Sequence, residues 1–224
     1  MNLFLDLVQT ASRSVARARS GRVFHPIGSS FAGTLTVEES DSPSAHVLHG
    51  EWPVFVRASK AIGTPGNWPD IHGLALRIRH DAGPVDLLFA TVARQFPYIL
   101  VPSATWSSHP YSTFLRYTAS GEHVLLRLDP EQPHRAAASG NRSIERAVAG
   151  APLTFALMES AGRSWRSIGR LAVEAASDET AAFDPVINQH PLLRHSRLFA
   201  GIRGRAYAGS REGRGARGAV DRRV

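Results

Sequence analysis

The stretch Arg203-Gly-Arg-Ala-Tyr207-Ala-Gly-Ser-Arg-Glu-Gly-Arg214, close to the C-terminus, is the one around which the chain is organised. Side chains four residues apart lie one above the other on a helix, so Arg203 and Tyr207 would share a face. The predicted helix gains an apolar side from three residues at the same spacing, Leu198, Ile202 and Ala206. An arginine beside a phenol favours the phenolate, because an opposite charge stabilises the ionised form. This helix could therefore present an anionic oxygen ligand.

Tyrosine is one of the few side chains that hold haem iron from the proximal side. The stretch resembles the proximal helix of the catalase family, which reads Arg-x-x-x-Tyr, then a small residue, then Ser or Thr, and then Arg seven positions after the Tyr. The matching residues are Arg203, Tyr207, Ala208, Ser210 and Arg214. The lead-in Phe183-Asp184-Pro185-Val186 resembles the Phe-x-Pro turn that precedes this helix in the family. On the helix alone, a tyrosine packed against the scaffold is the alternative.

A second match begins at Arg22-Val-Phe-His25-Pro-Ile-Gly28 and continues through Gly33 into a predicted strand over 34–37. The proline after His25 favours an extended conformation there, and the glycines permit bends or close backbone approach. The distal stretch of the catalase family has Arg, His and two Gly at this spacing. The resemblance implies that His25 is the acid–base residue over the haem and that Arg22 meets a haem propionate. An isolated histidine here could also be structural.

The segment from Trp52 to Gly63 reads as a strand and turn, and its Val-Arg57-Ala-Ser59 resembles the family's Val-Arg-Phe-Ser. The resemblance implies that Arg57 and Arg214 bind propionates as well. It also implies that Ser59 orients His25 through a hydrogen bond, a contact that fixes the imidazole ring. The alternative for Ser59 is an ordinary hydroxyl at the end of a strand.

The next two predicted strands resemble the family but depart from it at two positions. Gly73-Leu-Ala-Leu-Arg-Ile-Arg79 resembles its Arg-Gly-Phe-Ala strand, with His72 in place of the Arg. Val85–Thr91 resembles its Asp-Leu-Val strand, but Ala90 stands where catalases have an Asn that holds peroxide. Efficient disproportionation of hydrogen peroxide is therefore not expected. The chain resembles the small catalase-related peroxidases, at minimal length.

Further alternating segments are predicted as strands, namely 112–118, 123–128, 153–158 and 167–173. They bring the total to about eight, with a short helix over 143–148 and a polar loop over 38–50. Many short strands without βαβ alternation favour an antiparallel barrel. We therefore expect a mainly β (α+β) fold, an antiparallel eight-stranded catalase-like barrel with a C-terminal haem-ligand helix.

Residues 1–214 are predicted to form one domain, followed by a basic flexible tail over 215–224. Residues 1–20 read as an amphipathic helix that would dock on the barrel, with dimerisation or contact with a membrane surface as alternatives. Residues 194–224 contain nine Arg against Glu212 and Asp221, which accounts for the whole net charge of +7. Several of these arginines have a role in the haem hypothesis, so we expect no nucleic-acid partner.

The chain contains no Cys, which excludes disulfides, Cys-ligated zinc and iron–sulfur clusters and suits a cytoplasmic protein. It has no apolar run long enough for a transmembrane helix, so no integral membrane contact is expected. The hypothesis is a peroxidase-like enzyme with haem b, a peroxide and a small organic electron donor; a homodimer is left open. The alternative is a binding protein whose barrel holds an apolar ligand without haem.

Overall fold

The computed structural model describes residues 27–195 except 134, 137, 162 and 163. Several predictions fall outside these residues: the helix over 1–20, the distal residues Arg22 and His25, and the tail over 215–224. The haem-ligand helix with Arg203, Tyr207 and Arg214 lies outside them too. Of the predicted site residues, Arg57 and Ser59 are described.

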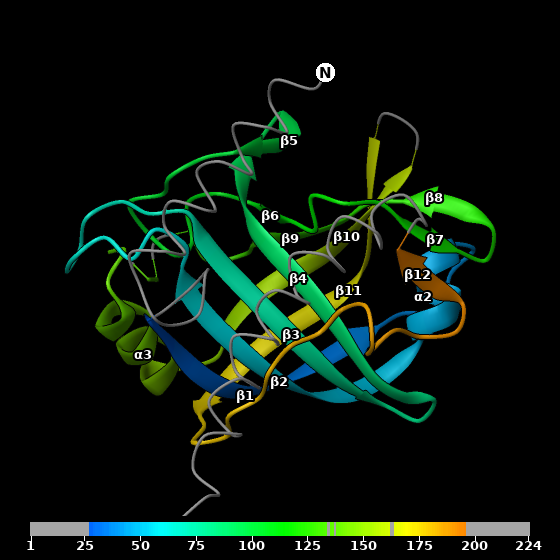
Figure 1. Ribbon diagram of the computed structural model, residues 1–224, viewed down its shortest axis with the longest axis horizontal. Helices are drawn as coiled ribbons and strands as arrows, with labels where there is room; N and C mark the ends of the chain where they lie inside the picture. The colour runs from blue at the N-terminus through cyan, green and yellow to red at the C-terminus, as the bar shows by residue number, and fades with distance from the viewer. Residues whose placement is uncertain (1–26, 134, 137, 162–163, 196–224) are drawn as a thin grey trace, which may run out of the picture.

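Eight antiparallel strands close into a barrel (Figure 1). Their order around the barrel is β3-β2-β1-β11-β10-β9-β6-β4, and the pairing of β4 with β3 closes it. The prediction of a mainly β, eight-stranded antiparallel barrel is therefore confirmed. The strands are β1 (Ile27–Val37), β2 (Gly50–Lys60), β3 (His72–His80), β4 (Gly83–Ala93), β6 (Tyr111–Ser112), β9 (Leu126–Pro130), β10 (Leu153–Ala161) and β11 (Ser164–Ala176).

Alternation along each strand divides its side chains between the barrel interior and the outer face. On β2, for example, Val54, Val56 and Ala58 belong to the buried core. Large side chains fill this interior, among them Phe31, Leu35, Leu76, Leu87 and Phe155, each at most 1% exposed. The interior is a packed core, as expected for a barrel of this size.

Smaller elements complete the described chain. Strand β5 (Phe96–Leu100) extends the sheet beyond β4, and β12 (Leu193–His195), β7 (Tyr117–Ala119) and β8 (Glu122–Val124) form a separate three-stranded sheet. Helix α3 (Asn141–Gly150) confirms the helix predicted over 143–148, and it buries Ile144, Ala147 and Val148. Neither described helix is long and apolar enough to cross a membrane.

Two predicted strands are each divided in the structure. The segment 112–118 forms β6 and β7, because Phe114 has a φ of 60° that ends the first strand. Leu115 donates a hydrogen bond to the Thr113 carbonyl at 2.6 Å within this turn. The segment 123–128 forms β8 and β9, which belong to different sheets.

The prediction of a loop over 38–50 is wrong, because this segment contains helix α2 (Pro43–Leu48). Ser42 caps this helix by accepting a hydrogen bond from the Ala45 amide, and Pro43 suits its first position. The buried carboxylate of Glu159 on β10 accepts a further hydrogen bond from the Ser44 amide at 2.7 Å. A contact between residues so far apart in sequence leaves no local pattern.

Gly33 lies where β1 and β11 approach each other most closely. The register shifts between Ala32 and Gly33, and a Cβ on Gly33 would overlap the Ala172 carbonyl. Glycine is therefore required at this position by the neighbouring strand.

We expect Gly33→Ala to lower the free energy of unfolding by about 1–3 kcal/mol, because the added methyl group overpacks a backbone contact. Urea denaturation of Gly33→Ala and the wild type measures this difference in the free energy of unfolding. Gly150→Ala is the control, since its Cβ would meet only Arg135 Nη2 at 3.8 Å. Equal stability of both variants would contradict the close approach.

Candidate functional site

The outer face of β1–β4 carries both described site residues. Ser59 faces away from the core, because side chains alternate along a strand and its neighbour Ala58 belongs to the core. Ser59 lies opposite Gly28 of β1 and Gly73 of β3, and Gly73 lies opposite Ala90 of β4. Paired residues on neighbouring strands share a face, so one row of small residues runs across four strands.

A second row lies beside the first. Arg57 is opposite Ser30 of β1 and Ala75 of β3, and Ala75 is opposite Leu88 of β4. We call these two rows the outer platform, which comprises Gly28, Ser30, Arg57, Ser59, Gly73, Ala75, Leu88 and Ala90. Its residues are small apart from Leu88 and Arg57, which is the only charged side chain among them.

Gly28 brings Arg57 close to β1. A Cβ on Gly28 would lie 2.6 Å from the Ala58 carbonyl oxygen and 3.1 Å from Arg57 Nη2. The absence of that Cβ gives the partly buried guanidinium its place against the sheet. Both glycines of the predicted distal stretch, Gly28 and Gly33, thus lie at tight contacts between strands.

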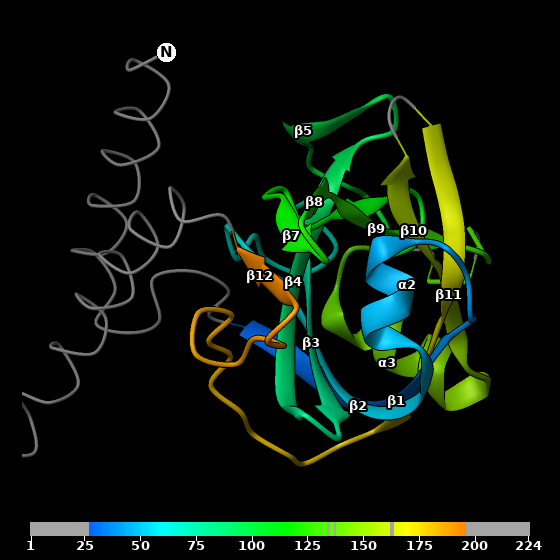
Figure 2. The ribbon, with the colours of Figure 1, turned by 90° about the vertical axis from the view of Figure 1, so that its right-hand side faces the viewer.

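A strap over residues 177–189 crosses the outer face beside the platform (Figure 1; Figure 2). Its anchor is Asp86 of β4, whose carboxylate is fully buried. Arg77 of β3 donates to both carboxylate oxygens at 2.7 Å. In the strap, the Asp184 amide and Asn188 Nδ2 donate to Asp86 Oδ2 at 2.7 and 2.9 Å. The hydrogen bonds from Arg77 to Asp86 raise the pKa of Arg77, so this guanidinium stays charged.

Phe183 packs the strap onto β2 and β3. Its ring stacks on Phe55, with 5.6 Å between the ring centroids. Arg77 lies over the Phe183 ring, with its Cζ 5.3 Å from the ring centroid. Phe55 is the next outward residue of β2 beyond Arg57. Two stretches that resemble the catalase family, around Asp86 and around Phe183, are therefore in contact. The sequence indicated both stretches but not the ion-paired anchor between them.

His72, which replaces an Arg of the family, points into the barrel and not towards the platform. The His72 side chain is fully buried and stacks on Trp106, with 4.0 Å between the ring centroids. Its Nε2 lies 2.8 Å from Ser139 Oγ and forms a hydrogen bond with it. Burial lowers the pKa of His72 to about 4, and the charge of Asp70 opposes this only in part. These contacts indicate a structural role.

We expect His72 to make the fold acid-sensitive. Because its pKa is lower in the folded state than the usual 6.5, the unfolded chain binds the proton first as the pH falls. The contribution of His72 is fully present above about pH 6.5 and is lost towards pH 4, at about 1.4 kcal/mol per pH unit. Urea denaturation across this range should give a shallower pH dependence for His72→Gln than for the wild type. The exposed His49→Gln is the control, and an unchanged slope in His72→Gln would contradict the assignment.

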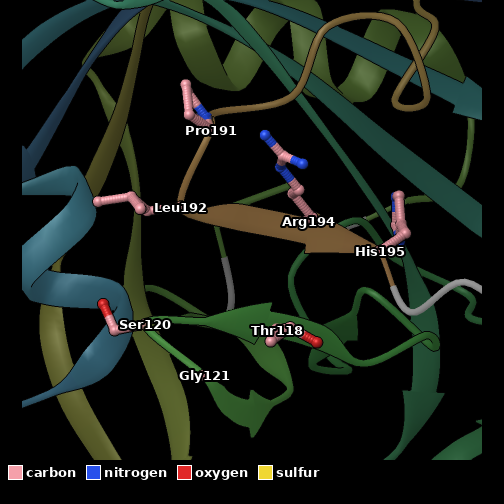
Figure 3. A pocket seen from close by; sticks show the side chains of 7 residues that line it. All are labelled: Thr118, Ser120, Gly121, Pro191, Leu192, Arg194 and His195. Atoms are coloured by element: carbon pink, nitrogen blue, oxygen red, sulfur yellow. The ribbon is translucent and has the colours of Figure 1, made fainter.

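A surface pocket of about 390 Å³ lies between β12 and the β7–β8 turn (Figure 3). Thr118, Pro191, Leu192, Arg194 and His195 line it together with the turn residues. It shares no residue with the outer platform. Among the described residues, no group of three or more His, Asp or Glu could hold a metal ion.

No protein-family model and no curated protein matches the chain by sequence. Solved structures do match, at 13% sequence identity in each of three cases. Catalase A from Saccharomyces cerevisiae has a TM-score of 0.66 over 94% of this chain and 64% of its own length. A bacterial catalase has a TM-score of 0.64 over 94% of this chain and 60% of its own. A fungal catalase has a TM-score of 0.58 over 86% of this chain and 58% of its own.

This likeness shows a catalase-like fold, in which the barrel resembles the catalase core. The chain spans about three fifths of the length of these catalases.

Proposed function

We propose that the protein is a haem-dependent, peroxidase-like oxidoreductase that reduces hydrogen peroxide or organic peroxides with a small organic electron donor. The outer platform is the observation that carries this proposal. It combines small side chains in two adjacent rows with one arginine, on the outer face of a barrel with a catalase-like fold.

The described residues fit a flat ring that carries carboxylates. The platform residues Gly28, Gly73, Ala75 and Ala90 have at most one side-chain carbon, which permits close approach to the sheet. Arg57 at its edge can bind a carboxylate through a charge-assisted and bidentate pair. Large side chains pack the interior of the barrel, which favours the outer face over a ligand inside the barrel.

Residues outside the described part would complete the site. Tyr207 would hold the iron of haem b and Arg203 would tune its phenolate, while Arg22, Arg57 and Arg214 would bind the propionates. When bound, the haem supplies the iron at which the peroxide O–O bond is cleaved. The donor set, a phenolate with several arginines, suits this cofactor.

His25 is the proposed proton carrier. It would take a proton from the bound peroxide and return it to the departing oxygen, a role typically worth about 10²–10⁴-fold in rate. Ser59 would hold the imidazole ring in the productive orientation. The register supports this pairing, because Gly28, three residues after His25, lies directly opposite Ser59.

The proposal is tested by the absorption spectrum of the freshly purified protein, which should show a Soret band with one haem b per chain. We expect Tyr207→Phe to change this spectrum and to retain less haem, because the phenolate ligand is lost. Tyr98→Phe, which removes an exposed phenol of β5, is the control. A protein without a Soret band would refute the haem proposal, and identical spectra for Tyr207→Phe and the wild type would refute Tyr207 as the ligand.

A further inference from the structure

The edge strand β5 exposes a run of apolar side chains. Phe96, Tyr98, Ile99 and Leu100 are 42 to 57% exposed. These four are half of the eight large hydrophobic side chains that are exposed among the described residues. Both ribbon views place β5 at one end of the molecule, beyond the barrel wall (Figure 1; Figure 2). We call the segment 92–100 the β5 hairpin.

The sequence around the β5 hairpin contains arginines and no acidic residues. From Leu87 to Gly121 the sequence contains no Asp or Glu. Arg94, in the turn between β4 and β5, is exposed, and so is Arg116, which donates a hydrogen bond to the Tyr98 hydroxyl at 2.9 Å. An apolar strand with arginines at its margin suits a partner that is apolar inside and anionic at its surface.

A second copy of this chain fits the β5 hairpin poorly. Pro97 has no amide hydrogen, so it cannot donate to a neighbouring strand, and proline on an edge strand discourages edge-to-edge pairing. A two-fold contact between hairpins would also bring Arg94 and Arg116 of both copies together, and like charges repel. The hairpin is therefore better suited to a lipid surface than to itself.

We propose that the β5 hairpin docks the protein on the surface of anionic phospholipid membranes. Phe96, Ile99 and Leu100 would enter the boundary between headgroups and acyl chains, where apolar area is removed from water. Tyr98 would keep its hydroxyl at the polar level, as amphipathic aromatic side chains do. Arg94 and Arg116 would meet the lipid phosphates. This docking is independent of haem and goes beyond the proposed enzymatic function.

The test is co-sedimentation of the full-length protein with phosphatidylcholine vesicles, with and without phosphatidylglycerol. We expect binding to require phosphatidylglycerol and to weaken as salt is added. The double variant Phe96→Ser with Ile99→Ser should reduce the partition coefficient roughly 30-fold, because two half-exposed apolar side chains no longer enter the interface. Arg94→Gln should reduce it about fivefold.

Matched controls keep both chain ends unchanged, so their basic residues contribute equally to every variant. Ile187→Ser removes an apolar side chain that is 64% exposed in the strap, and Arg146→Gln removes an exposed arginine of α3. Both should bind like the wild type. Equal binding by the β5 double variant and the wild type, or no binding to anionic vesicles, would overturn the proposal. A concentration-dependent dimer that the double variant abolishes, without vesicle binding, would instead assign the hairpin to a second copy.

Discussion

His25→Ala is expected to leave the haem content nearly unchanged while the peroxide rate per bound haem falls by about 10²–10⁴-fold. The reason is that the role proposed for His25 is proton transfer, whereas Tyr207 is the residue proposed to hold the iron. Stopped-flow mixing with peroxide gives the rate, and the haem absorbance per chain gives the occupancy.

Arg57→Ala should give the opposite pattern and serves as the matched comparison. Removing the guanidinium takes away the proposed propionate partner at the edge of the outer platform, so haem occupancy should fall while the rate per bound haem stays similar. Arg57→Lys keeps the charge but not the bidentate geometry, so its haem occupancy should lie between those of Arg57→Ala and the wild type. If His25→Ala loses haem as severely as Arg57→Ala, His25 is a structural residue of the barrel entrance and the enzyme hypothesis loses its main support.

Asp86→Asn is expected to lower the free energy of unfolding by about 3–5 kcal/mol, because it removes one partner of a buried ion pair. Asp86 is fully buried and accepts hydrogen bonds from Arg77, the Asp184 amide and Asn188. An amide nitrogen at one carboxylate position would face donors and leave them unsatisfied. Urea denaturation measures the stability, and limited proteolysis should show faster cleavage within the strap.

The strap provides its own control, because a second ion pair joins it to β3. Arg79 and Glu179 are 2.7 Å apart, but their side chains are 60% and 38% exposed. Exposed pairs contribute little, so Glu179→Gln should change stability by less than about 1 kcal/mol. Similar losses in Asp86→Asn and Glu179→Gln would show that Asp86 is not the anchor.

The barrel could be predicted because its signals are local. In β2, Val54, Val56 and Ala58 face the core, and the residues between them fall on the outer face. That alternation also places Arg57 and Ser59, two positions apart, on one face. The glycine spacing in the distal stretch was informative too, since Gly28 and Gly33 lie where strands approach closely.

Features that depend on distant contacts could not be predicted. Helix α2 has only six residues, too few for a helical period, and the Glu159 carboxylate that supports it lies on β10. The Asp86 anchor joins strand β4 to a strap 98 residues further along the chain. Strand β5 was missed because its exposed apolar residues follow one another without alternating with polar ones.

The outer platform and the core share the same four strands. One residue inserted into β2 would therefore move the side chains beyond it from one face of the strand to the other. Val56 and Ala58 would turn towards solvent, and Arg57 and Ser59 would enter a hydrocarbon interior. Length changes in these strands therefore abolish fold and site together, whereas substitutions at every second position alter one and spare the other. An engineer could rebuild the outer platform of this barrel, from Gly28 to Ala90, without changing a single core side chain.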